Sequence, residues 1–134
     1  MMFKYYTNEI NEVSSLIREA FDIDVKTDDI ILQDNQKILL LKDNDKLVGL
    51  SLITLKLDPF KNKKTYYIDY LCVKKEYQHQ SLGRKIFEKI IEIAKNNNID
   101  RIELTSRKER KTARKIYLDY GMVIKDTDLF VLDL

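Results

Sequence analysis

The residues best suited to chemistry lie between Val73 and Lys85, where the sequence reads VKKEYQHQSLGRK. We predict that a strand ends at Val73 and that a helix begins near Leu82 after a short loop. The first N–H groups of a helix lack internal partners and carry the positive end of its dipole, so they bind anions such as a pyrophosphate. Gly83 would let a ligand approach the backbone, and the cations Arg84 and Lys85 follow it. The segment is either an anion-binding turn or an ordinary solvated connection.

Three other side chains are candidates for acid–base or nucleophilic chemistry. Asp69 precedes the turn, and strict alternation places it on one face with Leu71 and Val73, where apolar neighbours would raise the pKa of its carboxyl group. A raised pKa suits a carboxylate that must take up a proton. We interpret Cys72, the single cysteine, as a buried residue rather than a catalytic thiol. His79 falls within the turn and is a poor candidate for a base.

The elements that position these residues follow from apolar spacing and turn residues. A first helix is expected through residues 10–21, capped by Thr7 or Asn8. The acidic residues 22–36 are expected to be irregular, with room for one short helical turn. Two further helices are predicted at Leu82–Lys95 and Lys111–Tyr120, the second ending at Gly121. Strands are predicted at Phe3–Tyr6, Lys37–Leu41, Lys46–Leu57, Thr65–Val73, Arg101–Ser106, Met122–Lys125 and Leu129–Leu134.

This order, β-α-(α)-β-β-β-α-β-α-β-β, predicts an α/β or mixed α+β fold. The strand–helix–strand succession in the second half implies one parallel pair within a mostly antiparallel sheet flanked by helices. With 134 residues, the chain is expected to form a single domain over residues 1–134.

Composition limits the classes of function. Hydrophobic residues make up 44% and charged residues 34%, which is typical of a soluble globular protein. No apolar run approaches the roughly 18 residues of a membrane span, and the first residues lack the features of a secretory signal, so we expect a cytoplasmic protein without membrane association. One histidine and one cysteine cannot build a structural zinc site, and we expect no metal. The net charge of +2 gives no case for nucleic-acid binding, which would rest only on the basic run Arg107–Lys115.

Residues 73–83 resemble the acetyl-CoA signature of the GNAT superfamily of N-acetyltransferases. In that signature a strand ending in valine leads, after a short loop, into Gln/Arg-x-x-Gly-x-Gly/Ala. Gln78 occupies the Gln/Arg place and Gly83 the second glycine place, whereas Ser81 stands where the family usually has its first glycine. Serine keeps the backbone N–H but adds a Cβ, which would alter the turn or tighten the approach of a phosphate.

A second stretch, residues 113–122, resembles the family's Ala-x-x-Φ-Tyr-x-x-x-Gly-Φ segment, in which Φ is apolar. The resemblance implies that Tyr117 points at the cofactor sulfur, where a phenol with a pKa of about 10 can protonate a departing thiolate. The alternative is that Tyr117 is only a core aromatic. Arg110 stands where many members carry an asparagine that contacts the cofactor, and an arginine could still reach a phosphate.

The resemblance further implies that the thioester lies against residues 70–73, with a backbone N–H as the oxyanion donor. Asp69 lies near positions where some members carry a glutamate, so we predict Asp69 as the base, with Glu103 or a water chain as alternatives. Together with Tyr117 as the acid, these make up the predicted catalytic groups. The predicted acetyl-CoA-binding residues are Leu71, Cys72, Val73, Gln78, His79, Gln80, Ser81, Leu82, Gly83, Arg84, Lys85 and Arg110.

The sequence thus predicts transfer of an acetyl group from acetyl-CoA to a primary amine by direct attack, without a covalent acyl-enzyme. The acceptor is expected to be a small molecule rather than a protein, and the acidic residues 22–29 are either part of its site or a solvated loop. The alternative function is a CoA-binding sensor or interaction module without turnover. Either a monomer or a homodimer fits the sequence.

Overall fold

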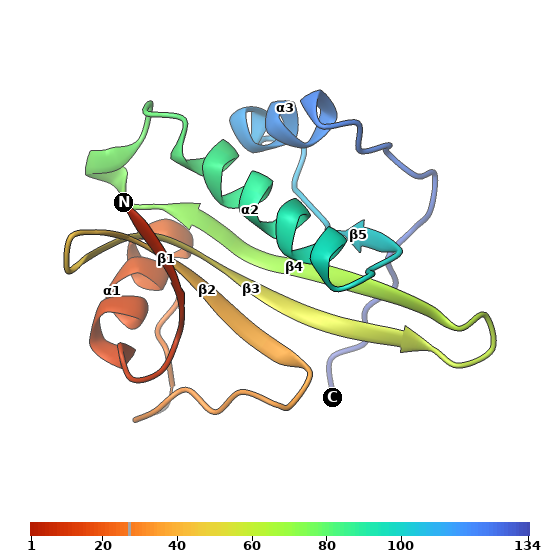
Figure 1. Ribbon diagram of the computed structural model, residues 1–134, viewed down its shortest axis with the longest axis horizontal. Helices are drawn as coiled ribbons and strands as arrows, with labels where there is room; N and C mark the ends of the chain where they lie inside the picture. Colours follow the sequence, from red (N-terminus) through yellow and green to blue (C-terminus); the bar gives the residue numbers. More distant parts are fainter. Residues whose placement is uncertain (27) are drawn as a thin grey trace.

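The computed structural model describes residues 1–26 and 28–134, so Thr27 of the acidic loop lies outside the described residues. Five strands form one sheet in the order β1-β2-β3-β4-β5 (Figure 1). Neighbours are antiparallel except β4 and β5, which are parallel. The elements are β1 (Met2–Tyr5), α1 (Ile10–Phe21), β2 (Gln36–Asp43), β3 (Lys46–Asp58), β4 (Lys63–Val73), the 3-10 turn η1 (Lys75–Tyr77), α2 (Leu82–Asn96), β5 (Arg101–Glu103) and α3 (Lys111–Asp119).

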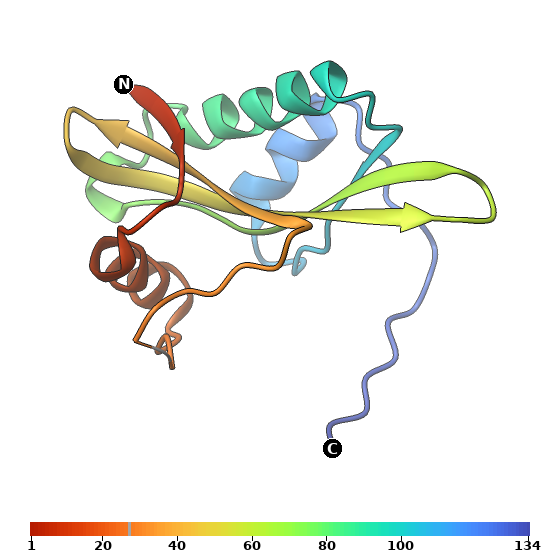
Figure 2. The same cartoon turned by 60° about the horizontal axis from the view of Figure 1, so that its bottom comes forward.

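Helices cover both faces of the sheet, with α1 below it and α2 and α3 above it in the view of Figure 2. One apolar cluster joins α1 to Ile38 and Leu40, and the other joins α2 to Leu39 and Leu41. A strand that is buried on both faces needs an apolar side chain at every position. This is why β2 carries a continuous apolar run instead of an alternating one.

Close approach of α2 to the sheet depends on Gly49 in β3. A Cβ at this position would lie 2.7 Å from Cδ1 of Ile86 and 3.0 Å from the carbonyl oxygen of Cys72. Both distances are shorter than ordinary contacts, and the second partner is backbone that cannot swing away. A glycine here therefore sets how closely the start of α2 can pack on β3 and β4.

The predicted mixed fold with one parallel strand pair is confirmed, and the helices start and end within a few residues of the predicted bounds. Two predictions at the chain's ends are wrong. The residue that caps α1 is Glu9 and not Thr7 or Asn8. The strands expected at Met122–Lys125 and Leu129–Leu134 do not form, because this segment runs away from the sheet and has no pairing partner among the described residues.

Other differences are small. No helical turn is assigned to the described part of residues 22–36. The strand expected over residues 101–106 ends at Glu103, where the chain leaves the sheet towards α3. None of the described helices is long and apolar enough to cross a membrane.

The carboxylate of Glu9 ties β1 to the start of α1. It is buried, with 8% of the residue exposed, and it pairs with Lys4. The backbone N–H groups of Thr7 and Asn8 donate to its Oε2 at 3.0 and 3.1 Å. Burial alone would raise the pKa of Glu9, but the hydrogen bonds from Lys4, Thr7 and Asn8 outweigh burial and hold the pKa at about 2.

We expect Glu9→Gln to lower the free energy of unfolding by about 2 kcal/mol near neutral pH, because hydrogen bonds to a charged acceptor are the stronger kind. The folded-state pKa lies below the unfolded value of 4.5. The contribution of the carboxylate is therefore complete above that value and is lost as the pH falls towards about 2. Urea unfolding across this pH range should show that the difference in free energy of unfolding between wild type and Glu9→Gln shrinks as the pH falls. The control is Glu12→Gln, at an exposed position on the same helix, for which we expect no such change with pH. A difference that does not change with pH would contradict this account.

Candidate functional site

The geometry of the site begins with one extra residue in β4. Leu52 of β3 lies opposite Asp69, and Leu50 lies opposite Cys72. Two steps along β3 therefore match three along β4, which defines a β-bulge. Tyr70 within the bulge has a left-handed φ of 55°, an unusual conformation for a residue with a side chain.

Ser51 stabilises the bulge from the neighbouring strand. It lies on β3 between Leu50 and Leu52. Ser51 is fully buried, and its hydroxyl donates a hydrogen bond to the carbonyl oxygen of Asp69 at 3.2 Å. A bulge disrupts the ladder locally, and a buried carbonyl without a partner is costly. The serine hydroxyl supplies a partner at this point and so stabilises the irregular strand.

The bulge reverses which side chains face which side of the sheet. Before it, Ile68 packs in the α2 cluster, and Asp69 lies opposite Leu52, which packs on the α1 side. After it, Leu71 and Val73 pack on the α2 side. The expectation that Asp69 shares one face with Leu71 and Val73 is therefore wrong, because strict alternation does not continue through a bulge.

Beyond the bulge β4 also parts from β5. The two strands pair only where Thr65–Tyr67 lies beside Arg101–Glu103. Just beyond the end of β5, the hydroxyl groups of Tyr67 and Thr105 form a hydrogen bond of 3.2 Å. From there the chain turns towards α3, while β4 continues to Val73 (Figure 1). Within the described chain, no strand pairs with this edge of β4 after Tyr67, so its backbone groups are open to a ligand.

The turn that leads from β4 into α2 leaves the start of the helix uncapped. Ser81 is the N-cap of α2 in the left-handed conformation (φ 60°), and its side chain does not cap the helix. His79 is also left-handed (φ 66°). Both side chains are exposed, as is Gln80 between them. The first N–H groups of α2, which have no intrahelical acceptor, are thus left to a ligand or to water.

Two residues that were predicted to bind the cofactor form polar contacts within the protein. The side-chain amide nitrogen of Gln78 donates a hydrogen bond to the carbonyl oxygen of Val73 at 3.3 Å, which closes the loop around η1. Arg84 forms an ion pair with Asp119 of α3 and lies over the ring of Tyr120. Its charge is directed to α3, whereas Lys85 is exposed beside the turn.

Gly83 lies at the contact between α2 and α3. A Cβ at this position would lie 3.3 Å from Cδ1 of Ile116, so the glycine lets α2 and α3 approach each other. Of the two left-handed positions in the turn, His79 and Ser81, the second stands where the family usually has its first glycine. Glycine adopts this conformation more easily than serine does.

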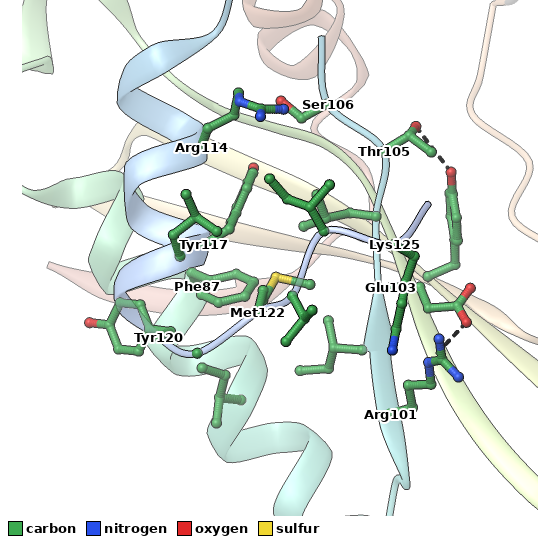
Figure 3. Close-up of a pocket in the computed structure, with 18 of the residues that line it drawn as sticks. Phe87, Arg101, Glu103, Thr105, Ser106, Arg114, Tyr117, Tyr120, Met122 and Lys125 are labelled. Carbon is green, nitrogen blue, oxygen red and sulfur yellow. Dashed lines mark hydrogen bonds and ion pairs between the residues drawn. The ribbon is translucent and has the colours of Figure 1, made fainter. Parts of the chain in front are cut away.

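Tyr117 lines a cavity of about 1110 Å³ between α2, β5 and α3. Its ring packs on Phe87 at 5.2 Å between centroids, and Figure 3 shows the side chain projecting from α3 towards the space beside Thr105 and Ser106. Burial raises the pKa of Tyr117, and the charge of Arg110 opposes the rise in part. The phenol is therefore protonated at neutral pH and able to donate its proton.

A second cluster lies on the α1 side of the opening. The rings of Phe21 and Tyr70 are nearly perpendicular, with 5.3 Å between their centroids, and the guanidinium of Arg110 lies 4.7 Å from the centre of the Phe21 ring. Arg110 therefore lies against α1 rather than over the start of α2. Burial raises the pKa of Asp69, as predicted. Burial also raises the pKa of the Cys72 thiol to about 12, with small opposing effects, so Cys72 is protonated and unsuited to nucleophilic attack.

The cluster of Phe21, Tyr70 and Arg110 was missed by sequence reasoning, although the bulge that creates it leaves a trace. The buried or half-buried apolar positions of β4 run through Ile68 and then shift phase to Leu71 and Val73. A phase shift in an alternating strand is the sequence signal of an inserted residue.

Comparison with known families decides the class. The sequence profile described as the Acetyltransferase (GNAT) family matches residues 5–122, most of the chain. The chain belongs to the GNAT acetyltransferase family. The predicted family, fold and enzyme class are thereby confirmed. No curated protein matches this GNAT chain closely enough in sequence to be counted as a relative.

Solved structures share the GNAT fold. An aminoglycoside acetyltransferase, meta-AAC0020 from an uncultured soil metagenomic sample, superposes with a TM-score of 0.83 at 16% identity, over 99% of this chain and 95% of the other. A ribosomal-protein-alanine N-acetyltransferase from Brucella melitensis biovar Abortus 2308 gives 0.81 at 16% identity over the whole of both chains. The BH1408 protein from Bacillus halodurans gives 0.73 at 26% identity, again over both whole chains.

Ser81→Gly should raise the melting temperature of this GNAT protein by a few degrees. The left-handed conformation costs a non-glycine residue about 1–2 kcal/mol, which exceeds the extra backbone entropy that glycine loses on folding. Ser15→Gly, at an exposed position inside α1, is the matched control and should lower the melting temperature. The measurement is differential scanning calorimetry. If both variants lowered the melting temperature alike, the argument from the left-handed conformation of Ser81 would be contradicted.

Proposed function

We propose that this protein transfers an acetyl group from acetyl-CoA to the primary amine of a small molecule or peptide, by direct attack and without a covalent acyl-enzyme. The observation that carries the proposal is the opening between β4 and β5 beside the uncapped start of α2. Acetyl-CoA carries phosphates at one end and a thioester at the other. Its site therefore needs free N–H groups for the phosphates, and next to them exposed strand backbone for the arm that carries the thioester.

The phosphates would bind the backbone N–H groups at the start of α2, around Gln80 to Gly83, with Lys85 beside them. Exposed His79 and Gln80 and the uncapped Ser81 support this placement. The amide groups of the cosubstrate's arm would continue along the open edge of β4, from Val73 to Leu71. Side chains play little part there, because Leu71 and Val73 pack into the core and Cys72 is buried.

The proposed reaction places an acid and a base on opposite sides of the opening. Asp69, on the α1 face, takes a proton from the amine, whose nitrogen attacks the thioester carbon. A backbone N–H of the open edge of β4 stabilises the carbonyl oxygen as negative charge develops there. The carbon–sulfur bond then breaks, and Tyr117 donates its proton to the departing thiolate. The products are an N-acetylated amine and free CoA.

The described geometry favours Asp69 over Glu103 as the base. Glu103 Oε1 pairs with Nε of Arg101 at 3.1 Å, so this carboxylate is already engaged in an ion pair. Burial raises the pKa of Asp69, which suits a group that must accept a proton. Asp69 also lies within the bulge, next to the open edge of β4.

The acceptor would approach from the α1 face. Tyr70 and Asp69 follow each other in the bulge on that side, and an aromatic ring beside a carboxylate suits a cationic amine. Two solved structures with this fold are named for amine acceptors, an aminoglycoside and a ribosomal-protein alanine. They support an amine as the class of acceptor for this chain.

Tyr117→Phe should lower kcat for acetyl transfer by about 10²–10⁴-fold, the usual contribution of a general acid. Binding of acetyl-CoA should change little, since one neutral hydrogen bond is worth about 1 kcal/mol. Tyr120→Phe is the matched control, because Tyr120 also packs on Phe87 but its hydroxyl bonds to Glu88 on the outer side of α2. The measurement is steady-state release of CoA across a panel of amines, with mass detection of the product.

Three outcomes would each contradict a part of this proposal. An unchanged kcat in Tyr117→Phe would show that another group or water protonates the sulfur. If acetyl-CoA raised the melting temperature but no amine on the panel were acetylated, a CoA-binding sensor would replace the enzyme. A folded protein whose melting temperature did not respond to millimolar acetyl-CoA would exclude both functions.

The pH dependence of the rate tests the proposed base. Asp69 must be deprotonated to accept a proton, so kcat/KM should fall as the pH drops through a value above the ordinary 3.8. Asp69→Asn should lower the rate and remove this acid limb, whereas Glu103→Gln should keep it. The limb persisting in Asp69→Asn and vanishing in Glu103→Gln would reverse the assignment.

A further inference from the structure

Arg110 reaches from one side of the sheet to the other at the opening beside β4. It is the N-cap residue of α3, and its guanidinium lies 4.7 Å from the centre of the ring of Phe21, the last residue of α1. The helices α1 and α3 lie on opposite faces of the sheet (Figure 2). The charge of Arg110 opposes the rise that burial causes in the pKa of Cys72 and in the pKa of Tyr117. The guanidinium therefore lies near the open part of β4 and near the candidate acid.

Aromatic rings hold the guanidinium in this place. Phe21 contacts Arg110 and also Tyr70, whose ring is nearly perpendicular to it at 5.3 Å between centroids. An aromatic ring attracts the charge of a guanidinium but offers no oxygen atom to its five N–H donors. These donors remain for another acceptor.

Arg110 forms no ion pair within residues 1–26 and 28–134. Three other arginines are each paired with a carboxylate, as Arg18–Asp24, Arg84–Asp119 and Arg101–Glu103. Arginine is suited to such pairing because its planar fork of donors matches a carboxylate. At Arg110 the fork is held in position, but the described part of the chain does not supply the carboxylate.

The carboxylates near this end of α1 do not neutralise Arg110. Glu19 accepts a hydrogen bond from the backbone N–H of Lys75 at 3.0 Å. Asp22, the next residue after α1, is exposed. Burial alone shifts the pKa of Asp69, with no contribution from Arg110. The opening thus presents a cation and a carboxylate that are not paired with each other.

Two separate opposite charges suit an acceptor that itself carries both charges. The amine of the acceptor lies next to Asp69 in the proposed reaction, and an anionic group on the same molecule would meet Arg110 on the same α1 side of the opening. A carboxylate accepts two parallel hydrogen bonds from an arginine. We propose that the acceptor is an amine that also carries a carboxylate, such as an amino acid, and that Arg110 binds this carboxylate. The inference rests on the proposed acetyl transfer for the place of the amine.

The phosphates of the cosubstrate are the other anions that an arginine could bind. Their proposed place is the uncapped start of α2, beside the exposed Lys85. Arg110 lies instead against α1, next to the aromatic pair of Phe21 and Tyr70. This position favours the acceptor over the cosubstrate as the source of the anion.

Pairs of amines that differ only in a carboxylate test the proposal. The pairs are lysine and cadaverine, ornithine and putrescine, and phenylalanine and phenethylamine. The measured quantity is the ratio of kcat/KM for the carboxylated member of a pair to kcat/KM for its counterpart. For the best carboxylated acceptor, Arg110→Gln should lower this ratio by about 10–100-fold, because a hydrogen bond to a charged group is lost. Arg110→Lys should recover part of the ratio, since it keeps the charge but not the fork.

Arg107→Gln is the matched control. Arg107 is an exposed arginine three residues before Arg110, and its substitution should leave the ratio unchanged. A ratio that Arg110→Gln also leaves unchanged would overturn the proposal. If, in addition, CoA bound more weakly to Arg110→Gln in isothermal titration calorimetry, Arg110 would be assigned to the cosubstrate instead.

Ligand-observed NMR in the presence of CoA separates this inference from acetyl transfer, because binding needs no turnover. A carboxylated amine should bind more weakly to Arg110→Gln than to the wild type, while its counterpart shows no such difference. This result without any acetylated product would contradict the proposed enzyme and support the carboxylate site. No binding of any carboxylated amine, or an equal effect on both members of each pair, would overturn the carboxylate site even if acetyl transfer were observed.

Discussion

The extra residue in β4 is the constraint on which the arrangement of the site depends. By adding one residue opposite Ser51, the bulge turns Asp69 to the α1 face and Leu71 and Val73 to the α2 face. The strand pairs with β5 only before this point. A local change in backbone geometry thus produces both the opening for a ligand and the separation of the candidate acid from the candidate base. The left-handed backbone at Tyr70 is tolerated because the buried Ser51 hydroxyl and the ladder to β3 hold it in place.

The opening gains its chemistry from the helices that surround it. α2 begins where β4 ends, so its free N–H groups point into the same region as the unpaired strand edge. Gly49 and Gly83 let α2 pack closely on β3 and on α3, and α3 in turn carries Tyr117 to the cavity beside β5. The absence of a side chain at these two contacts therefore controls how the start of α2, the edge of β4 and the Tyr117 phenol are placed relative to one another.

The two edge strands of the sheet, β1 and β5, have different surroundings. β1 is short, and the buried Glu9 carboxylate ties its end to α1. β5 is also short but lies next to an apolar space, while the most apolar part of the chain's last segment lies in water. Like β1, β5 pairs on one side only, so an open edge of the sheet lies next to the candidate site.

The sequence by itself determined the order of the elements from β1 to α3, the approximate helix bounds and the connection from β4 into α2. These features are local: apolar periodicity defines α2, and the run from Ile38 to Leu41 defines a buried strand whatever lies around it. The sequence also identified Tyr117, through a motif. Only the tertiary structure decided that Asp69 and Val73 lie on opposite faces, that Gly83 lies where α2 meets α3, and that Arg84 pairs with Asp119. Each of these depends on the register between strands or on contacts between residues distant in the chain, which alternation and spacing do not encode. For the same reason the sequence predicted a strand at Leu129–Leu134 that the sheet does not contain.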